Sequence, residues 1–216
     1  MNLAVDTSTP VPVESRVLRI REHLERQQYA QALAAAEALL REVPENRDVL
    51  YMLAVSYRNL SRIPEALATL ERLERLHPRF SRLYQERGHC LVALRDVPKA
   101  IEAYPRGVNI NPALPASWDK LEALYRISGD ADNAARAADH VATLKRLPAE
   151  VVTATALFSD GELALAENIV RAYLLKHGDH VEAMRLLARI GMAQEVYDDA
   201  EVLLAAVLAI TPGYRA

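Results

Sequence analysis

Apolar residues recur along the chain at helical spacing, in pairs of runs that a short polar turn separates. In residues 47–80 the first run is Leu50, Leu53, Ala54 and Tyr57, and the second is Ala66, Leu70, Leu73 and Leu76. This spacing places the apolar side chains of each run on one face of a helix. Alanine and leucine dominate and runs of β-branched residues are few, which argues against sheets. The pattern therefore predicts an all-α protein built of antiparallel pairs of amphipathic helices.

A small residue recurs in the second run of each pair with a fixed period. The recurring alanines are Ala32, Ala66, Ala100, Ala134, Ala166 and Ala200. The first four are spaced by 34 residues, and the last two intervals are 32 and 34 residues. Two antiparallel helices need a small side chain where they approach most closely, and alanine meets that need. Self-similarity at such a period is typical of solenoid proteins.

Two further markers keep the same register. A proline lies 12 residues after four of the alanines, at Pro44, Pro78, Pro112 and Pro212. A residue that can fill a helix junction lies three before each alanine: Tyr29, Ile63, Val97, Ala131, Leu163 and Tyr197. Because proline cannot continue a helix, it turns the chain into the next unit. The markers predict a flexible leader over residues 1–14 and a repeat domain over 15–216, with units at 15–46, 47–80, 81–114, 115–148, 149–180 and 181–214.

Two departures from the period predict local irregularity. The fourth unit has Arg146 where the proline belongs and Pro148 instead, and the fifth unit is two residues short. We therefore expect an irregular joint at about residues 145–152. Pro105 and Gly107 fall inside the second helix of the third unit. A proline inside a helix costs about 3 kcal/mol or more, so this helix should kink or shorten there.

The 34-residue unit resembles the tetratricopeptide repeat (TPR) over residues 13–214. Units two, three, four and six carry the large, small, aromatic and proline positions of that motif best. The resemblance implies a right-handed superhelical solenoid of about six helix pairs, whose first helices line a concave, protein-binding groove. It assigns to that groove Tyr51, Val55, Arg58, Asn59, Arg82, Gln85, His89, Asp119, Arg126, Val151, Phe158, Glu182, Arg185 and Arg189. Their polar and somewhat basic mixture suits an extended peptide of acidic character.

A narrower resemblance concerns the segments Ala100–Tyr104 and Asn111–Trp118. The amino-acid sequences of these segments are similar to those of the TPR arrays that precede a sulfotransferase domain in some bacterial proteins. It implies an alternative function, as a substrate-positioning or dimerisation module of a larger enzyme. The chain itself lacks a phosphate-cradling loop, because its seven glycines are isolated. Chaperone-tail binding is set aside, because no three consecutive units carry the lysine, asparagine and arginine pattern of that clamp.

Catalytic, metal and cofactor sites are not expected. His177 and His180 are two close histidines, but zinc prefers four ligands, so we interpret them as the turn after a helix. Cys90 lies inside a helix, and neighbouring His89 points about 100° away from it, so we expect a packed, inert thiol. The sequence predicts a non-enzymatic scaffold without cofactor.

Charge and hydropathy exclude two classes of partner. A formal net charge of −3 gives no basic face for nucleic acid. The longest apolar run, Val202–Ile210, has nine residues, whereas a membrane-spanning helix needs about 20. A single cysteine and the lack of a secretion signal at the N-terminus favour a cytoplasmic location.

The two ends of the array differ in polarity. The first helix carries Arg16, Arg19, Arg21 and Arg26, as a polar capping repeat would. The segment Val202–Ile210 is apolar on every side of its helix, so we expect other parts of the protein or a partner to bury every side. Either a partner subunit covers it, or further chain did so in a longer parent protein. We expect the chain to self-associate through this helix; a purely structural role as a self-assembling spacer is the third hypothesis for its function.

Overall fold

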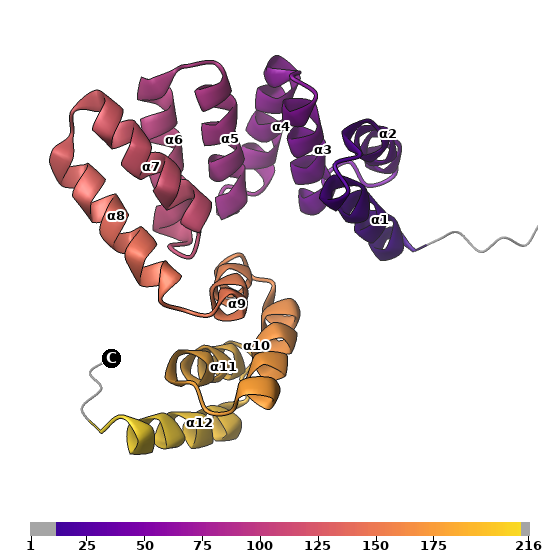
Figure 1. Ribbon diagram of the computed structural model, residues 1–216. Helices are drawn as coiled ribbons and strands as arrows, with labels where there is room; N and C mark the ends of the chain where they lie inside the picture. Colours follow the sequence, from indigo (N-terminus) through magenta and orange to yellow (C-terminus); the bar gives the residue numbers. More distant parts are fainter. Residues whose placement is uncertain (1–11, 213–216) are drawn as a thin grey trace, which may run out of the picture. The chain divides into compact units, whose positions relative to one another are not determined.

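The computed structural model describes residues 12–212, and within them the chain forms α-helices and no strands (Figure 1). The helices are α1 (Val13–Glu25), α2 (Tyr29–Leu40), α3 (Arg47–Asn59), α4 (Ile63–Leu76), α5 (Ser81–Ala93), α6 (Val97–Ile110), α7 (Pro115–Ser128), α8 (Ala131–Lys145), α9 (Ala149–Ser159), α10 (Leu163–His177), α11 (Val181–Ala193) and α12 (Tyr197–Ile210). The predicted all-α class is confirmed. Residues 1–11 of the expected leader lie outside the described residues, and α1 begins at Val13, two residues before the expected start of the first unit.

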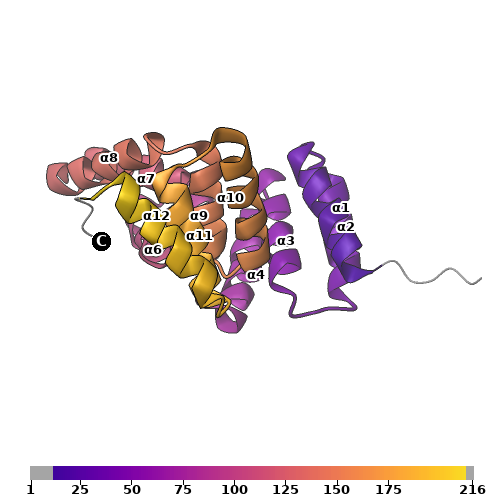
Figure 2. The ribbon, with the colours of Figure 1, turned by 90° about the horizontal axis from the view of Figure 1, so that it is seen from below.

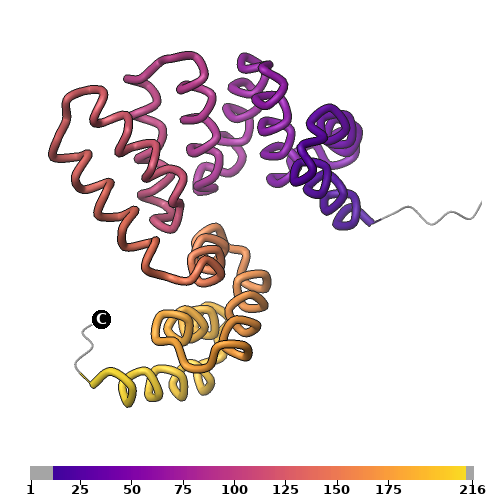
Figure 3. Tube along the Cα trace, in the orientation of Figure 1, coloured from indigo at the N-terminus to yellow at the C-terminus, as the bar shows by residue number. Residues whose placement is uncertain are grey.

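The recurring alanines lie in the second helix of each pair, at its contact with the first. Each second helix begins three residues before its alanine, at the residue interpreted from the sequence as a junction filler. Ala32, Ala66, Ala100 and Ala166 are completely buried, and Ala134 and Ala200 nearly so. The alternation of short turns and antiparallel helices is visible along the chain trace in Figures 2 and 3. The period in the sequence is therefore the period of the helix contact.

The turn inside each pair requires one residue in the left-handed region. It lies two residues before the second helix, and φ is positive at Gln27 (58°), Ser61 (62°), Arg95 (59°), Gly129 (79°), Gly161 (82°) and Glu195 (64°). Glycine adopts this conformation freely, whereas other residues lose about 1 kcal/mol or more. Four of the six turns consequently store a small backbone strain.

Replacing the strained residue with glycine should stabilise the fold. Arg95 is exposed, so Arg95→Gly should raise the free energy of unfolding by about 0.5–1 kcal/mol through its backbone. Gly161→Ala should lower it by about 1 kcal/mol, although no atom lies within 4 Å of an added Cβ. Urea denaturation followed by circular dichroism measures both effects.

Arg95→Ala is the matched control, since it removes the same side chain and keeps the left-handed backbone. An Arg95→Gly variant no more stable than Arg95→Ala would contradict the strain.

The helices belong to two compact units, residues 1–100 and 101–216, whose boundary falls inside α6. In the first unit each helix from α1 to α5 contacts the next helix along the chain. The first helices of successive pairs also contact each other, α1 with α3 and α3 with α5. In the second unit α7 packs on α8, and α9 to α12 pack in succession, with α9 also contacting α11. α2, α4 and α10 thus each lie between the first helix of their own pair and the first helix of the next.

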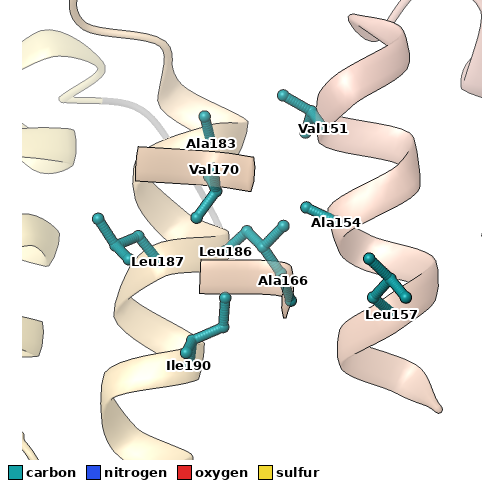
Figure 4. Close-up of a cluster of buried hydrophobic side chains, with 9 residues drawn as sticks. All are labelled: Val151, Ala154, Leu157, Ala166, Val170, Ala183, Leu186, Leu187 and Ile190. Carbon is teal, nitrogen blue, oxygen red and sulfur yellow. The ribbon is translucent and has the colours of Figure 1, made fainter. Parts of the chain in front are cut away.

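Each unit has an apolar core at these contacts. In the first unit Ala36 and Leu39 of α2 pack with Val49, Met52 and Leu53 of α3. In the second unit the core cluster draws on α9, α10 and α11 (Figure 4), and its members are Val151, Ala154, Leu157, Ala166, Val170, Ala183, Leu186, Leu187 and Ile190. The residues on the second helix are small or branched, so the two first helices can close on it from both sides.

Pro105 does not shorten its helix, and the expectation that it would is wrong. α6 has 14 residues, as many as α4. Ala103 and Tyr104 before the proline and Val108 after it are all buried. Their packing holds both turns in place against the loss of one backbone hydrogen bond. The kink stays a prediction.

The joint between the fourth and fifth pairs combines a long helix with a short one. α8 has 15 residues and α9 has 11, with three residues between them. Leu144 and Leu147 pack there with Ala113, Val152 and Ala156. The buried side-chain amide of Asn111 donates to the carbonyl oxygen of Ala156 at 3.0 Å. That amide ties the α6–α7 connection to α9.

Candidate binding surface

In the first unit the predicted groove residues come from α3 and α5, two helices in contact. Arg58 of α3 is joined to Glu86 of α5 by a short ion pair. The Glu86 side chain is 3% exposed and that of Arg58 is 26% exposed. The ion pair therefore lies in the floor between the two helices, and Arg58 already has a partner within the fold.

Burial dominates the electrostatics of this pair. Loss of water raises the pKa of the Glu86 carboxyl above its ordinary value, and the Arg58 guanidinium acts in the opposite direction. A buried ion pair contributes little net stability, but removing one partner leaves an uncompensated charge. Arg58 is thus primarily a structural residue of the groove floor.

Arg58→Met should lower the free energy of unfolding by about 3 kcal/mol at pH 8. Because the folded-state pKa of Glu86 lies above its unfolded value, stability is lost as the pH rises through the interval between them. Removing Arg58 takes away the group that lowers this pKa, so the interval widens upward and the defect should be smaller at pH 5. Urea denaturation at the two pH values measures it.

The control is the double variant Arg58→Met, Glu86→Met. Methionine is chosen because Met52 occupies the position of α3 that Glu86 occupies in α5. It should return to within about 1 kcal/mol of the wild type and lose the extra pH dependence. A double variant as unstable as Arg58→Met would contradict the buried-charge explanation.

The remaining predicted residues of the first unit are partly engaged in packing. Tyr51 meets Phe80 edge to face, with ring centroids 5.4 Å apart. The Asn59 side chain donates to the carbonyl oxygen of Val55 at 2.8 Å. Arg82, Gln85 and His89 are half-buried in a row along α5. The α3–α5 surface is therefore polar at its edge and rigid in its floor.

In the second unit a hollow lies between α9 and α11. Its volume is about 120 Å³, and it is lined by Leu147, Val151, Thr155, Glu182, Arg185, Leu186 and Arg189. The guanidinium of Arg189 lies over the ring of Phe158, 4.7 Å from its centroid. The structure thus brings together the five groove residues predicted on these two helices.

The hollow combines an apolar floor with a positive rim. Arg185 bonds Glu182 at 3.0 Å on the same helix. Arg189 is exposed. Within the described part of the chain, the interaction found for its guanidinium is the contact with the Phe158 ring, and no ion pair is found for it. Stacking on an aromatic face orients a guanidinium while leaving its N–H groups open to a carboxylate. The arrangement can receive an acidic side chain beside an apolar one.

The two predicted residues of α7 are not part of this hollow. The Asp119 carboxylate lies 4.0 Å from the Lys145 amine of α8. Arg126 bonds Glu122 on its own helix at 2.7 Å and is largely exposed. Both take part in ordinary surface ion pairs, which contribute little to stability.

Cys90 and the two close histidines have structural surroundings. The Cys90 thiol is buried, and burial, with the Glu86 charge, raises its pKa to about 12. Nδ1 of His180 accepts from the Ala183 N–H at 3.4 Å and caps α11, and Tyr173 contacts the rings of His177 and His180. The described part of the chain contains no group of three His, Cys, Asp or Glu side chains suited to a metal ion. Nor does it contain a helix of the length and apolarity that a membrane span requires.

Cys90 should resist alkylation in the folded protein. At pH 8 a thiol of this pKa is only on the order of 10⁻⁴ ionised, and its burial excludes the reagent. Iodoacetamide followed by mass spectrometry should label it in urea and leave it unlabelled in buffer.

Ala172→Cys supplies an exposed comparison thiol on α10 and should be labelled in both conditions. Equal labelling rates for Cys90 and the new thiol would contradict the burial.

Glu86 is the functional-surface residue that the groove pattern missed. It occupies the position that Met52 holds in α3 and Leu186 holds in α11, both of which are buried. A charged residue at a position that is apolar in α1, α3, α9 and α11 is the signal that could have found it; Lys120 of α7, the other charged residue at this position, is exposed. The basic partner of Glu86, Arg58, was instead interpreted as a ligand-facing side chain.

Comparison with known proteins agrees with this architecture. A family model described as tetratricopeptide repeat matches residues 17–79, 51–117 and 151–215. The Hsp70-Hsp90 organizing protein of Triticum aestivum is 28% identical over 91 residues, which are 42% of this chain and 16% of that protein. This chain therefore matches only a small part of its curated relative.

Solved structures show the same fold at low sequence identity. The pilF protein of Pseudomonas aeruginosa is 16% identical with a TM-score of 0.57, over 94% of this chain and 93% of that one. A chain of the APC/C hetero-tetramer Cut9-Hcn1 is 14% identical with a TM-score of 0.59, over 96% of this chain and 42% of that one. These likenesses confirm a solenoid of helix pairs.

Proposed function

Because the chain belongs to the tetratricopeptide repeat family, we propose that it is a non-catalytic scaffold that holds an extended peptide or protein segment against its first helices. The observation that carries the proposal is the hollow between α9 and α11. It places Arg189, stacked on Phe158, beside the apolar side chains of Val151 and Leu186. Such a site fits a segment with an acidic residue next to an apolar one.

The α3–α5 surface supports the same proposal in the first unit. Arg82, Gln85 and His89 offer a polar row for the backbone of an extended segment. Arg58 contributes through Glu86, by fixing the floor under that row. A test of binding must therefore leave Arg58 intact, because its removal destabilises the unit that presents the surface.

Arg189→Ala should weaken binding of an acidic peptide. The probe is a displayed library of unstructured 12-residue peptides, selected on the wild-type chain and measured by fluorescence anisotropy. Loss of a buried or stacked arginine at an interface typically costs about 1–2 kcal/mol, so the dissociation constant should rise about tenfold. The wild-type affinity should also fall as salt increases.

Arg136→Ala is the matched control, since Arg136 is an exposed arginine on α8, in the same unit. It should leave the affinity unchanged. Equal effects of the two substitutions, or a library that yields no binder, would contradict groove binding at this hollow.

The second candidate function is a substrate-positioning module of a larger enzyme, with a sulfotransferase as the candidate. The observation that favours it is that two of the matched proteins are longer chains, of which the match covers 16% and 42%, whereas it covers 93% of the pilF protein. The coding region beyond Ala216 distinguishes the two functions. A basic phosphosulfate-binding loop encoded there supports the enzyme module, and a stop codon there supports the independent scaffold.

A further inference from the structure

One side of α12, next to its contact with α11, is largely apolar and open. Tyr197, Leu204 and Leu208 lie on this side of the helix, and their exposed fractions are 62%, 39% and 56%. Val202 and Ile210 are also exposed, at 69% and 46%, but lie on other sides of the helix. An open hollow of about 440 Å³ runs over this side, and its lining is apolar apart from one carboxylate, Glu201: Met192, Tyr197, Ala200, Glu201, Leu204, Ala205 and Leu208. α12 lies beside α11 in Figures 1 and 2, and no helix follows it within residues 12–212.

The repeat itself shows that this face is one the fold normally covers. Leu204 is equivalent to Ala36, Leu70, Tyr104, Ala138 and Val170, each four residues after the recurring alanine; Ala138 is half-buried and the other four are completely buried. Ala36 packs with Val49 and Met52 of the following helix α3. Val170 packs with Ala183 and Leu186 of the following helix α11. Leu204 has the same position and chemistry without a following helix over it.

We propose that the α12 face of a second copy of this chain occupies this position. Consecutive helices of the repeat run antiparallel, so the missing cover is an antiparallel apolar helix. A two-fold axis through the middle of the α12 face brings the partner's α12 into that orientation, because an isologous interface pairs a surface with itself. Ala205 is an exposed small residue that lets the two helices approach closely.

The apolar area is smaller than a standard dimer interface and suits a weak dimer. Tyr197, Leu204 and Leu208, with Met192 of α11, present on the order of 400 Å² in each copy, against about 800 Å² per partner in a standard interface that includes its polar rim. Burying surface of this kind contributes about 25 cal/mol per Å² before association costs. An interface of this size is below that of obligate dimers, so we expect a dimer that forms only as the protein concentration rises.

The charges of α12 are compatible with this pairing. Its charged residues are Asp198, Asp199 and Glu201, all within its first two turns. In an antiparallel pair centred at Ala205, like carboxylates lie about 12–21 Å apart along the axis. That separation exceeds the screening length of about 8 Å at physiological salt. A parallel pair would place them side by side.

The other end of the chain is a poorer partner for this face. Val49 and Met52 of α3 cover the helix before them, and the equivalent residues of α1 are Ser15 and Leu18, which are exposed. Leu18 is flanked by the exposed and charged Arg19 and Glu22. Head-to-tail stacking would bury these charges against α12, so the two-fold arrangement is favoured.

A dimer of this kind deepens the proposed function, on which the following consequence rests. It joins two copies of the α9–α11 hollow in one particle. A partner with two acidic segments would then bind with an avidity that neither hollow provides. Dimerisation itself requires no ligand, so it can be tested separately from groove binding.

Sedimentation velocity of the full chain without peptide, from 1 to 100 µM, tests the proposal. The wild type should pass from monomer to dimer over this range. Leu208→Glu should remain monomeric at 100 µM with an unchanged circular dichroism spectrum. Leu175→Glu changes an equally apolar residue, 90% exposed on α10, and should dimerise as the wild type does.

Ala205→Cys tests the geometry, since a residue near a two-fold axis meets its own copy. Under mild oxidation it should form a disulfide-linked dimer, and the exposed Ala172→Cys should not; the buried Cys90 does not compete. A wild-type monomer at 100 µM would overturn the proposal. So would association that Leu175→Glu abolishes as fully as Leu208→Glu, or capture of an added basic amphipathic helix by a chain that stays monomeric.

Discussion

The contact between a second helix and the two first helices around it is the interaction on which the rest of this structure depends. A second helix carries an alanine toward its own first helix and larger apolar residues toward the next one. Ala166 and Val170 of α10 show both contacts, since they share one cluster with residues of α9 and α11. A single helix pair cannot bury both faces of its second helix, so each further pair that stacks on the array adds to the stability of the fold.

This constraint explains what the structure can and cannot present to a partner. The second helices are buried between neighbours, so the first helices supply the side chains at the exposed edge. The hollow between α9 and α11 arises there, because neighbouring first helices contact each other less closely than they contact the helix behind them. Within residues 12–212 no helix follows α12, and Leu204 is exposed where Val170 of α10 is buried.

Most of the fold could be predicted from the sequence, since the alanines, the junction residues and the prolines repeat with one period. The site was predicted less completely. The pattern identified Phe158, Arg185 and Arg189 because their positions in the repeat decide which way they point. The pattern does not predict the ion pair between Arg58 and Glu86, because the two residues are 28 positions apart in the sequence. Asn111 and Pro105 were missed for the same reason: tertiary packing around each decides whether a buried amide is satisfied or a proline tolerated.

The central claim is that a second helix with large apolar residues on its far side needs a helix there, and hydrogen–deuterium exchange tests it most directly. Amides of α12 should exchange faster than those of α10 in dilute protein, because the outer face of α12 is then uncovered. Raising the concentration should slow exchange in α12 and leave α4 and α10 unchanged. Protection of α12 equal to that of α10 at every concentration would contradict the account.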